Sequence, residues 1–327
     1  MRQHNFFLMF LKIVFFSAIL VSTSSARAEL KVVTTIKPLH SLIANVMDGV
    51  GEPALIIEGS TSPHSFTLKP SHAKLLEEAD IIFWIGEGIE TFMERPLESI
   101  VKNAEVVEFM EIESINKLKF REESIFEDHD DHDDHSDHDD HDDHDDHDDH
   151  SDHDDHGHAH GEFDPHIWLD PMNAKEMVHE IAHELGNLDP ANKDKYEANA
   201  KTTIQVLDQL VNDIDKGINK DAKFVVFHDA YQYFEERFGV RAAGALTLNT
   251  DVLPGAKQIA DIQDVIKDRG IKCIFSEPQF NPKIITTIAE DMNIKTGVFD
   301  PLGANIDSNK SLYFKLITNL GDELKGC

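Results

Sequence analysis

Short apolar runs alternate with amphipathic stretches in two separate parts of the chain. Four runs in the first part are rich in Val, Ile and Phe and have the length of buried strands; they occupy 30–36, 53–59, 80–86 and 104–110. The alternation restarts after residue 220 with four further runs, at 223–229, 240–246, 271–278 and 294–300. Because helical patterns separate consecutive runs, each part is predicted to form βαβ units around a mainly parallel four-stranded sheet.

A long helical pattern lies between the two parts. Apolar side chains recur at helical spacing up to Ile218, and Asp189-Pro190 supplies a start signal, with Asp189 as the capping residue. We therefore predict an α/β protein of two lobes, residues 29–188 and 221–327, joined by one rigid helix over 189–220.

The first 28 residues have the pattern of a secretory signal peptide. A short apolar run, Ile13 to Val21, follows a positively charged start, and Ala26-Arg27-Ala28 matches an A-x-A cleavage site. A membrane anchor is the alternative, but the apolar run is short and no lipidation cysteine follows it. The mature chain is predicted to begin near Glu29 and to be exported.

The net charge and the cysteine content further limit which partners and which compartment fit this chain. The formal net charge is −32, which disfavours binding to nucleic acid or to anionic membranes. Cys273 and Cys327 are the only cysteines, and an even pair in an exported protein predicts one disulfide. Two thiolate ligands of a metal are the alternative, disfavoured because neither cysteine has a cysteine or histidine nearby.

Residues 128–161 form a low-complexity tract of aspartate and histidine that cannot build a core, and we predict a disordered loop in the absence of metal. Dispersed imidazoles and carboxylates predict many weak metal sites, whereas a solvated acidic insertion that keeps the protein soluble is the alternative. The accessory ligands are His129, His132, His135, His138, His141, His144, His147, His150, His153, His156, His158 and His160.

Polar side chains at the ends of predicted strands define a second, smaller group. His64 lies in the loop after the second strand, His228 and Asp300 each end a strand, and His166 follows the tract. Ligands of open α/β sheets bind at the carboxyl ends of strands, so we expect these four side chains to converge between the lobes. Three imidazoles and one carboxylate suit a tetrahedral zinc ion.

The segments that carry these residues also indicate a family. The stretches "SPHSFTLKPS", "DPHIWLDPMNA", "FHDAYQYFEERFG" and "FSEPQFNP…GVFDPLG" resemble the metal-binding receptors of bacterial ABC importers, in particular the periplasmic zinc receptors. The resemblance implies two α/β lobes bridged by a long helix, with the metal in the cleft between them. It also implies a monomeric, periplasmic binding protein without catalytic activity, whose partners are an inner-membrane ABC permease and its cytoplasmic ATPase.

Carried over residue by residue, the resemblance implies that His64, His166 and His228 hold Zn²⁺. Asp300 stands at the family's fourth position, where zinc receptors use either the carboxylate or a water. Manganese receptors of the family usually carry a carboxylate where this chain has His228, which favours zinc. Some enterobacterial zinc receptors have a carboxylate immediately before the first ligand, where this chain has Pro63, so that contact is not expected. The cysteine pair matches a disulfide of the second lobe.

A rival motif occurs at 179–189, "HEIAHELGNLD", which satisfies the H-E-x-x-H pattern of zinc metalloproteases. On that interpretation His179, His183 and Asp189 would bind zinc and Glu180 would be the general base. The motif lies on a helix predicted to start at Asp170-Pro171 and to end at Gly186.

The apolar positions of that helix disfavour a protease. They form one face, made of Ala174, Met177, Val178, Ile181, Ala182 and Leu185, and the motif falls on the opposite, solvated face. A catalytic zinc needs a partly dry cavity. Three alternatives to a zinc receptor remain: a manganese receptor of the same fold, a metal-storage protein that relies on the tract, and the metalloprotease.

Overall fold

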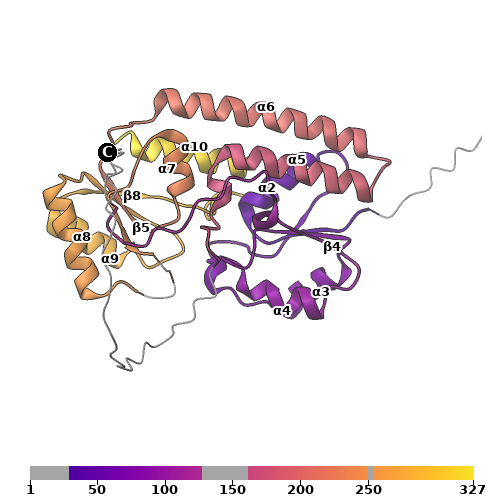
Figure 1. Cartoon of the computed structure of the whole chain (residues 1–327), viewed down its shortest axis with the longest axis horizontal. Coiled ribbons are helices and arrows are strands. Elements are labelled where there is room, and N and C mark those ends of the chain that lie inside the picture. Colours follow the sequence, from indigo (N-terminus) through magenta and orange to yellow (C-terminus); the bar gives the residue numbers. More distant parts are fainter. Residues whose placement is uncertain (1–28, 127–160, 249, 251–252) are drawn as a thin grey trace, which may run out of the picture.

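The computed structural model describes residues 29–126, 161–248, 250 and 253–327 (Figure 1). The predicted signal segment and nearly all of the tract lie outside these residues, so what was predicted for them stays a prediction. Within the described ranges, none of the helices combines the length and the apolar character that crossing a membrane requires.

The first lobe is built on a parallel sheet in the order β2-β1-β3-β4. Its strands are β1 (Val32–Thr34), β2 (Ala54–Leu55), β3 (Ile81–Trp84) and β4 (Glu105–Glu108). The helices are α2 (Lys37–Val46), α3 (Pro70–Glu78) and α4 (Glu94–Ser99). β1 and β3 are buried along their whole length, as expected of central strands covered on both faces.

The second lobe repeats this design with a parallel sheet in the order β6-β5-β7-β8. The strands are β5 (Phe224–His228), β6 (Ala245–Thr247), β7 (Cys273–Ser276) and β8 (Lys295–Val298). The helices are α7 (Gln232–Phe238), α8 (Ala256–Asp268), α9 (Lys283–Met292) and α10 (Leu312–Leu324). The predicted fold class, two parallel four-stranded sheets flanked by helices, is confirmed.

The long connecting helix is α6, which runs along both lobes in Figure 1. It spans Lys193–Gly217, so it begins four residues later than predicted. Asn192 occupies the N-cap position instead of Asp189. The Asp189 carboxylate is buried and accepts hydrogen bonds from the Asn192 amide at 2.6 Å and from the Tyr196 hydroxyl at 3.2 Å. Asp189 therefore stabilises the turn that precedes the helix.

The preceding helix, α5 (Pro171–Leu188), continues through Gly186, where the sequence predicted it to end. Gly186 is buried, and a Cβ atom there would lie 3.1 Å from Cγ of Lys193 at the start of α6. Glycine at this position allows α5 and α6 to pack closely, so it marks a helix contact and not a helix end.

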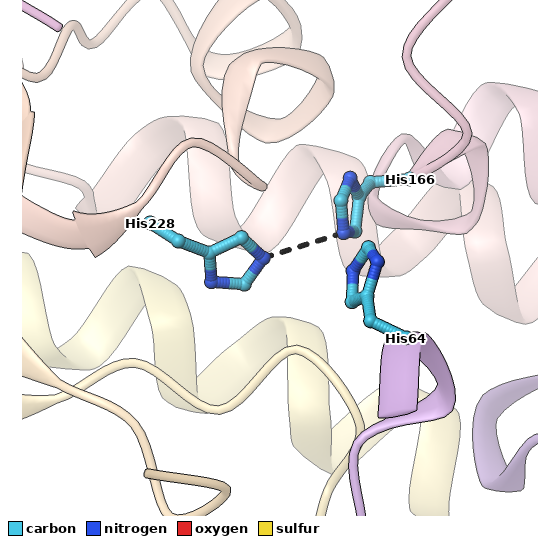
Figure 2. A group of neighbouring side chains, drawn as sticks. All are labelled: His64, His166 and His228. Atoms are coloured by element: carbon cyan, nitrogen blue, oxygen red, sulfur yellow. Dashed lines mark hydrogen bonds between the residues drawn. The ribbon is translucent and has the colours of Figure 1, made fainter. Parts of the chain in front are cut away.

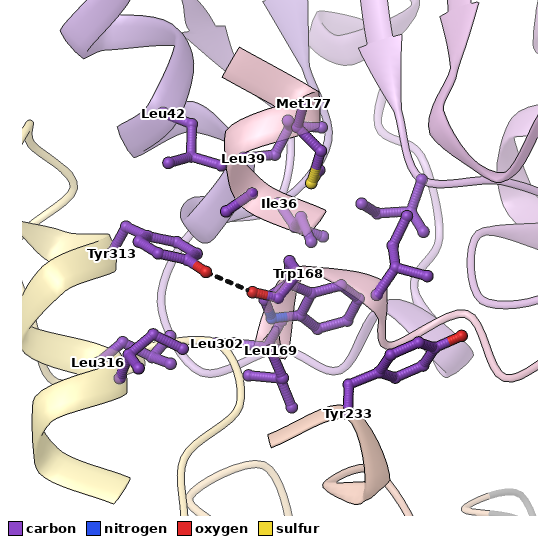
Figure 3. Close-up of a cluster of buried hydrophobic side chains, with 14 of the residues drawn as sticks. Ile36, Leu39, Leu42, Trp168, Leu169, Met177, Tyr233, Leu302, Tyr313 and Leu316 are labelled. Carbon is purple, nitrogen blue, oxygen red and sulfur yellow. Dashed lines mark hydrogen bonds between the residues drawn. The ribbon is translucent and has the colours of Figure 1, made fainter. Parts of the chain in front are cut away.

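The larger of two hydrophobic clusters in the described residues extends through both lobes, because α10 returns from the second lobe and packs on α2 and α6. The Tyr313 hydroxyl donates to the Trp168 carbonyl at 2.7 Å, and the Tyr313 backbone N–H donates to Ser41 Oγ on α2 at 3.1 Å (Figure 3). Leu39 of the first lobe and Leu316 of α10 are buried in the same cluster. The lobes are thus joined by shared packing as well as by α6.

The segment that leads into the tract also crosses between the lobes. Residues 109–126 leave β4, and the Leu118 N–H donates to the Tyr233 hydroxyl of α7 at 2.9 Å. Ile125 then forms an antiparallel bridge with Gly244 beside β6. The end of this segment, which the sequence assigned to the first lobe, therefore lies along the edge of the second sheet.

Candidate metal centre

Three histidines from three distant segments converge at the junction of the lobes (Figure 2). His64 lies in a 3₁₀ turn, Pro63–Ser65, that follows β2, and His228 is the last residue of β5. His166 immediately precedes a second 3₁₀ turn, Ile167–Leu169. The ligand positions therefore depend on two strand ends and on the loop that starts α5, as strand-end reasoning predicts for open α/β sheets.

The spacing of the imidazole nitrogens matches a zinc ion. Nε2 of His228 lies 3.4 Å from Nε2 of His166. Two nitrogens bound to one tetrahedral zinc are about 3.3 Å apart, given Zn–N bonds of about 2.0–2.1 Å. The ligand atoms of all three histidines lie within 4.8 Å of one another, so a shift of His64 by at most about 1.5 Å would complete the triangle.

Two buried carboxylates orient two of the imidazoles. Nδ1 of His166 bonds to Asp164 Oδ1 at 2.6 Å, and Nδ1 of His228 bonds to Glu277 Oε1 at 2.6 Å. Carboxylate oxygens accept, so in the neutral ring Nδ1 carries the proton and the Nε2 lone pairs face each other. Such an arrangement calls for a cation between them, as in the carboxylate–histidine–zinc triads of metal sites.

The same carboxylates set the electrostatics of the centre. Burial lowers the pKa of His228, but the charge and hydrogen bond of Glu277, together with the charges of Asp229 and Asp164, outweigh burial and raise the pKa above its usual value. Asp164 is fully buried and also accepts a hydrogen bond from the Gln232 side chain at 2.6 Å. The two carboxylates carry two negative charges, which a divalent cation would balance.

A cavity of about 10 Å³ adjoins the histidines, which is room for about one ion or water molecule. His166 and His228 are buried, whereas His64, Gln279 and Phe280 are half-buried, so the cavity meets solvent on the side of these three residues. Its wall is largely apolar and is made of Pro63, Ile89, Trp168, Phe280, Pro301 and Leu302, with Ser62, Glu277 and Gln279 as further polar lining.

Asp300 does not join the three-histidine group within the described part of the chain. Its Oδ1 accepts hydrogen bonds from the Gln279 side chain at 3.0 Å and from the Leu302 N–H at 3.1 Å. Its Oδ2 accepts from the Ala304 N–H at 2.5 Å. Here the carboxylate organises the loop after β8, which carries the cavity residues Pro301 and Leu302.

The remaining predicted residues are placed as follows. Cys273 and Cys327 form the predicted disulfide, which is thereby confirmed. His179 and His183 are exposed on α5, while Asp189 is buried and engaged with α6, so the protease ligands do not assemble. The twelve tract histidines fall outside the described residues.

Asp164 and Glu277 are the site residues that sequence reasoning missed. Glu277 directly follows β7, the neighbour of β5, so the strand-end rule that found His228 also applied to it. Asp164 stands two residues before His166, and its Oδ1 accepts a hydrogen bond from the His166 backbone N–H at 2.9 Å. This contact depends on the local turn, which the sequence reasoning did not identify.

Comparisons with known proteins agree with this geometry. Residues 32–327 match the family model described as "Zinc-uptake complex component A periplasmic". The high-affinity zinc uptake system protein ZnuA of Brucella abortus (strain 2308) is 48% identical over 303 residues, covering 90% of this chain and 91% of that protein. The protein of the same name from Yersinia pestis is 32% identical over 313 residues, covering 95% of each.

A solved structure described as "Crystal structure of ZnuA" shares the fold, with a TM-score of 0.70 and 22% identity over 90% of this chain and 98% of that one. At this sequence identity, the likeness shows a shared fold, meaning the arrangement of lobes and helices. Because the family model matches residues 32–327 and the two relatives match over 91% and 95% of their own length, the chain belongs to the family of periplasmic zinc-uptake components, which are substrate-binding receptors.

Proposed function

We propose that this protein captures Zn²⁺ in the periplasm and delivers it to an ABC permease, which works with a cytoplasmic ATPase. The observation that carries the proposal is the pair of imidazoles held 3.4 Å apart by two buried carboxylates, with a third imidazole at the mouth of an ion-sized cavity. The protein acts as a monomer, and no reaction is catalysed, because the cation itself is the cargo.

The donor set supports zinc over manganese. All three residues of the group offer nitrogen, which suits zinc, whereas manganese favours carboxylate and water oxygens. The carboxylates nearest to the site, Asp164 and Glu277, are hydrogen-bonded to the histidines and act through them. A manganese receptor of the same fold is therefore the weaker assignment.

For the fourth position we favour a water molecule over Asp300. The Asp300 carboxylate would have to give up hydrogen bonds to two backbone N–H groups and one side-chain amide before it could reach the ion. A third carboxylate would also leave the site with excess negative charge, since Asp164 and Glu277 already balance a dication. An Asp300→Asn variant that retains its zinc affinity supports water as the fourth ligand.

Metal competition tests the function. The purified mature protein is stripped of metal and exposed to equal Zn²⁺ and Mn²⁺, and the bound metals are measured by elemental analysis after a chelating buffer removes weakly held ions. We expect one retained zinc per chain and no retained manganese. Retention of manganese at the three-histidine site, with zinc excluded, would overturn the assignment.

Glu277→Gln should weaken zinc binding by about 10- to 100-fold, the usual loss when a partner that orients a metal-bound histidine is changed. The amide no longer carries the charge that favours binding of a cation, and it can present its N–H₂ group to Nδ1 of His228. Affinity is measured by competition with a fluorescent chelator. Glu290→Gln, an exposed change on α9 of the same lobe, is the control and should leave affinity unchanged; equal affinities in both variants would contradict the role of Glu277.

Deleting residues 128–161 should remove several weakly bound zinc ions and leave one tight ion. The twelve histidines of the tract offer dispersed sites in a segment whose composition cannot build a core, so we expect each to be weaker than the preformed centre. Calorimetric titration of the intact and shortened chains counts both classes of site. Loss of the tight ion upon deletion would make the tract the primary site.

A further inference from the structure

The H-E-x-x-H motif on α5 remains without a role in the receptor function. Among the histidines of the described residues, only His179 and His183 are exposed, and the His183 side chain is 63% accessible to solvent. The opposite face of α5 is buried in the core through Met177, Val178, Ile181 and Leu185. The two imidazoles therefore stand on the outer face of a helix that the core holds in place.

Residues four apart on a helix lie on the same face, with Cβ atoms about 5–6 Å apart. Two imidazoles at that spacing can bind one ion together, because each reaches a metal at about 2.0–2.1 Å. α5 extends over 18 residues and packs against α2 and α6, so the helix needs no ordering when an ion binds. This sets the pair apart from ligands that binding itself must bring into order.

The charge of this face favours a cation. Burial and the charge of Glu184 raise the pKa of Glu180, while His183 lowers it, so these three groups are electrostatic neighbours. His183 Nε2 lies 3.5 Å from Glu184 Oε1, a contact between an exposed imidazole and a half-buried carboxylate. The nearby cation Lys175 is paired with Asp208 on α6 at 2.6 Å.

We propose that His179 and His183 form a second, two-ligand metal site on the surface of α5, selective for imidazole-binding ions such as Zn²⁺, Ni²⁺ and Cu²⁺. Water molecules complete the coordination, and Glu180 and Glu184 supply charge. Because its ligands are exposed, the site exchanges its ion readily with solvent, unlike the buried centre. It has neither the third protein ligand nor the enclosed cavity of a protease, since Asp189 is bonded to Asn192 and Tyr196.

The test uses the full mature chain in which the twelve tract histidines are replaced by glutamine. Calorimetric zinc titration should then find two ions per chain, one tight and one weak. The chain is also applied to a copper(II)–iminodiacetate resin, whose immobilised ion can reach surface histidines but cannot enter a cavity of about 10 Å³.

The matched control exchanges two neighbouring residues, combining His183→Glu with Glu184→His. The exchange preserves composition and charge. It moves the second imidazole from four to five residues after His179, which rotates it by about a quarter turn around the helix. We expect this variant to lose the weak zinc and to elute from the resin at a lower imidazole concentration, while the tight zinc and the circular dichroism stay unchanged. If the exchanged variant keeps the weak zinc and elutes with the parent chain, His179 and His183 do not form a site.

Discussion

Replacing His228 by alanine should abolish tight zinc binding, with an affinity loss of roughly a hundredfold to a thousandfold. Structural zinc sites with four ligands have apparent binding free energies of about 10–16 kcal/mol, or about 2.5–4 kcal/mol per ligand, and about 1.4 kcal/mol corresponds to tenfold in affinity. His228 is buried and supplies one of the two nitrogens already at zinc spacing, so no other side chain of the described site can replace it. Chelator competition measures the loss.

The control for this variant is His72→Gln. Nδ1 of His72 accepts a hydrogen bond from the Lys69 N–H at the start of α3, and glutamine is a usual residue at this capping position. It should retain full affinity. Removing His228 also leaves Glu277 buried without its partner, so thermal unfolding of both metal-free variants is recorded. A folded His228→Ala protein that still holds zinc tightly would contradict the assignment of the centre.

Breaking the Cys273–Cys327 disulfide should reduce the free energy of unfolding by about 4 kcal/mol. The bridge joins residues 54 apart, and closing a loop of that length restricts the unfolded chain by about this amount in the chain-entropy model. Cys327→Ser is the cleaner variant because Cys327 is half-buried, whereas Cys273 lies in the buried strand β7 and its replacement adds a packing cost. Urea unfolding measures the difference.

Reduction of the wild-type bridge should lower stability as much as Cys327→Ser does, and the reductant should not affect the variant. The zinc centre lies at the other end of β7, and its second-lobe contacts come from Glu277 and His228, so tight zinc binding should survive in the folded variant. Unchanged stability after loss of the bridge would show that packing of α10 alone holds the carboxyl terminus.

The core that the two lobes share limits the movements by which zinc could leave the site. Separating the lobes widely would expose Trp168 and Tyr313, which are completely buried where the lobes meet. Aromatic side chains bury about 150–250 Å² each, worth about 25 cal/mol per Å², so wide opening costs several kcal/mol. The half-buried His64, on its short 3₁₀ turn, can move without breaking that core. Release through the His64 side therefore requires less rearrangement than a hinge motion.

Much of this molecule could be predicted from local patterns. Buried parallel strands are short and continuously apolar, so the runs that contain β3, β5 and β7 predicted the two sheets without further information. His228 could be found because chain direction places the last residue of a parallel strand at the ligand-binding edge. An even cysteine pair in a chain with the pattern of an exported protein predicted the disulfide for a chemical reason that needs no geometry.

Strand and helix periods, residue chemistry and motif identity are local properties, so they were enough to predict the two sheets, the long helix, the convergence of the three histidines and the disulfide. The tertiary structure set the remaining features. It turned Asp300 toward the backbone of its own loop, brought Glu277 to His228 across 49 positions, and returned α10 to the first lobe. Each of these depends on which buried polar groups and apolar faces meet once the chain is folded, and contacts between distant segments leave no periodic pattern in the sequence.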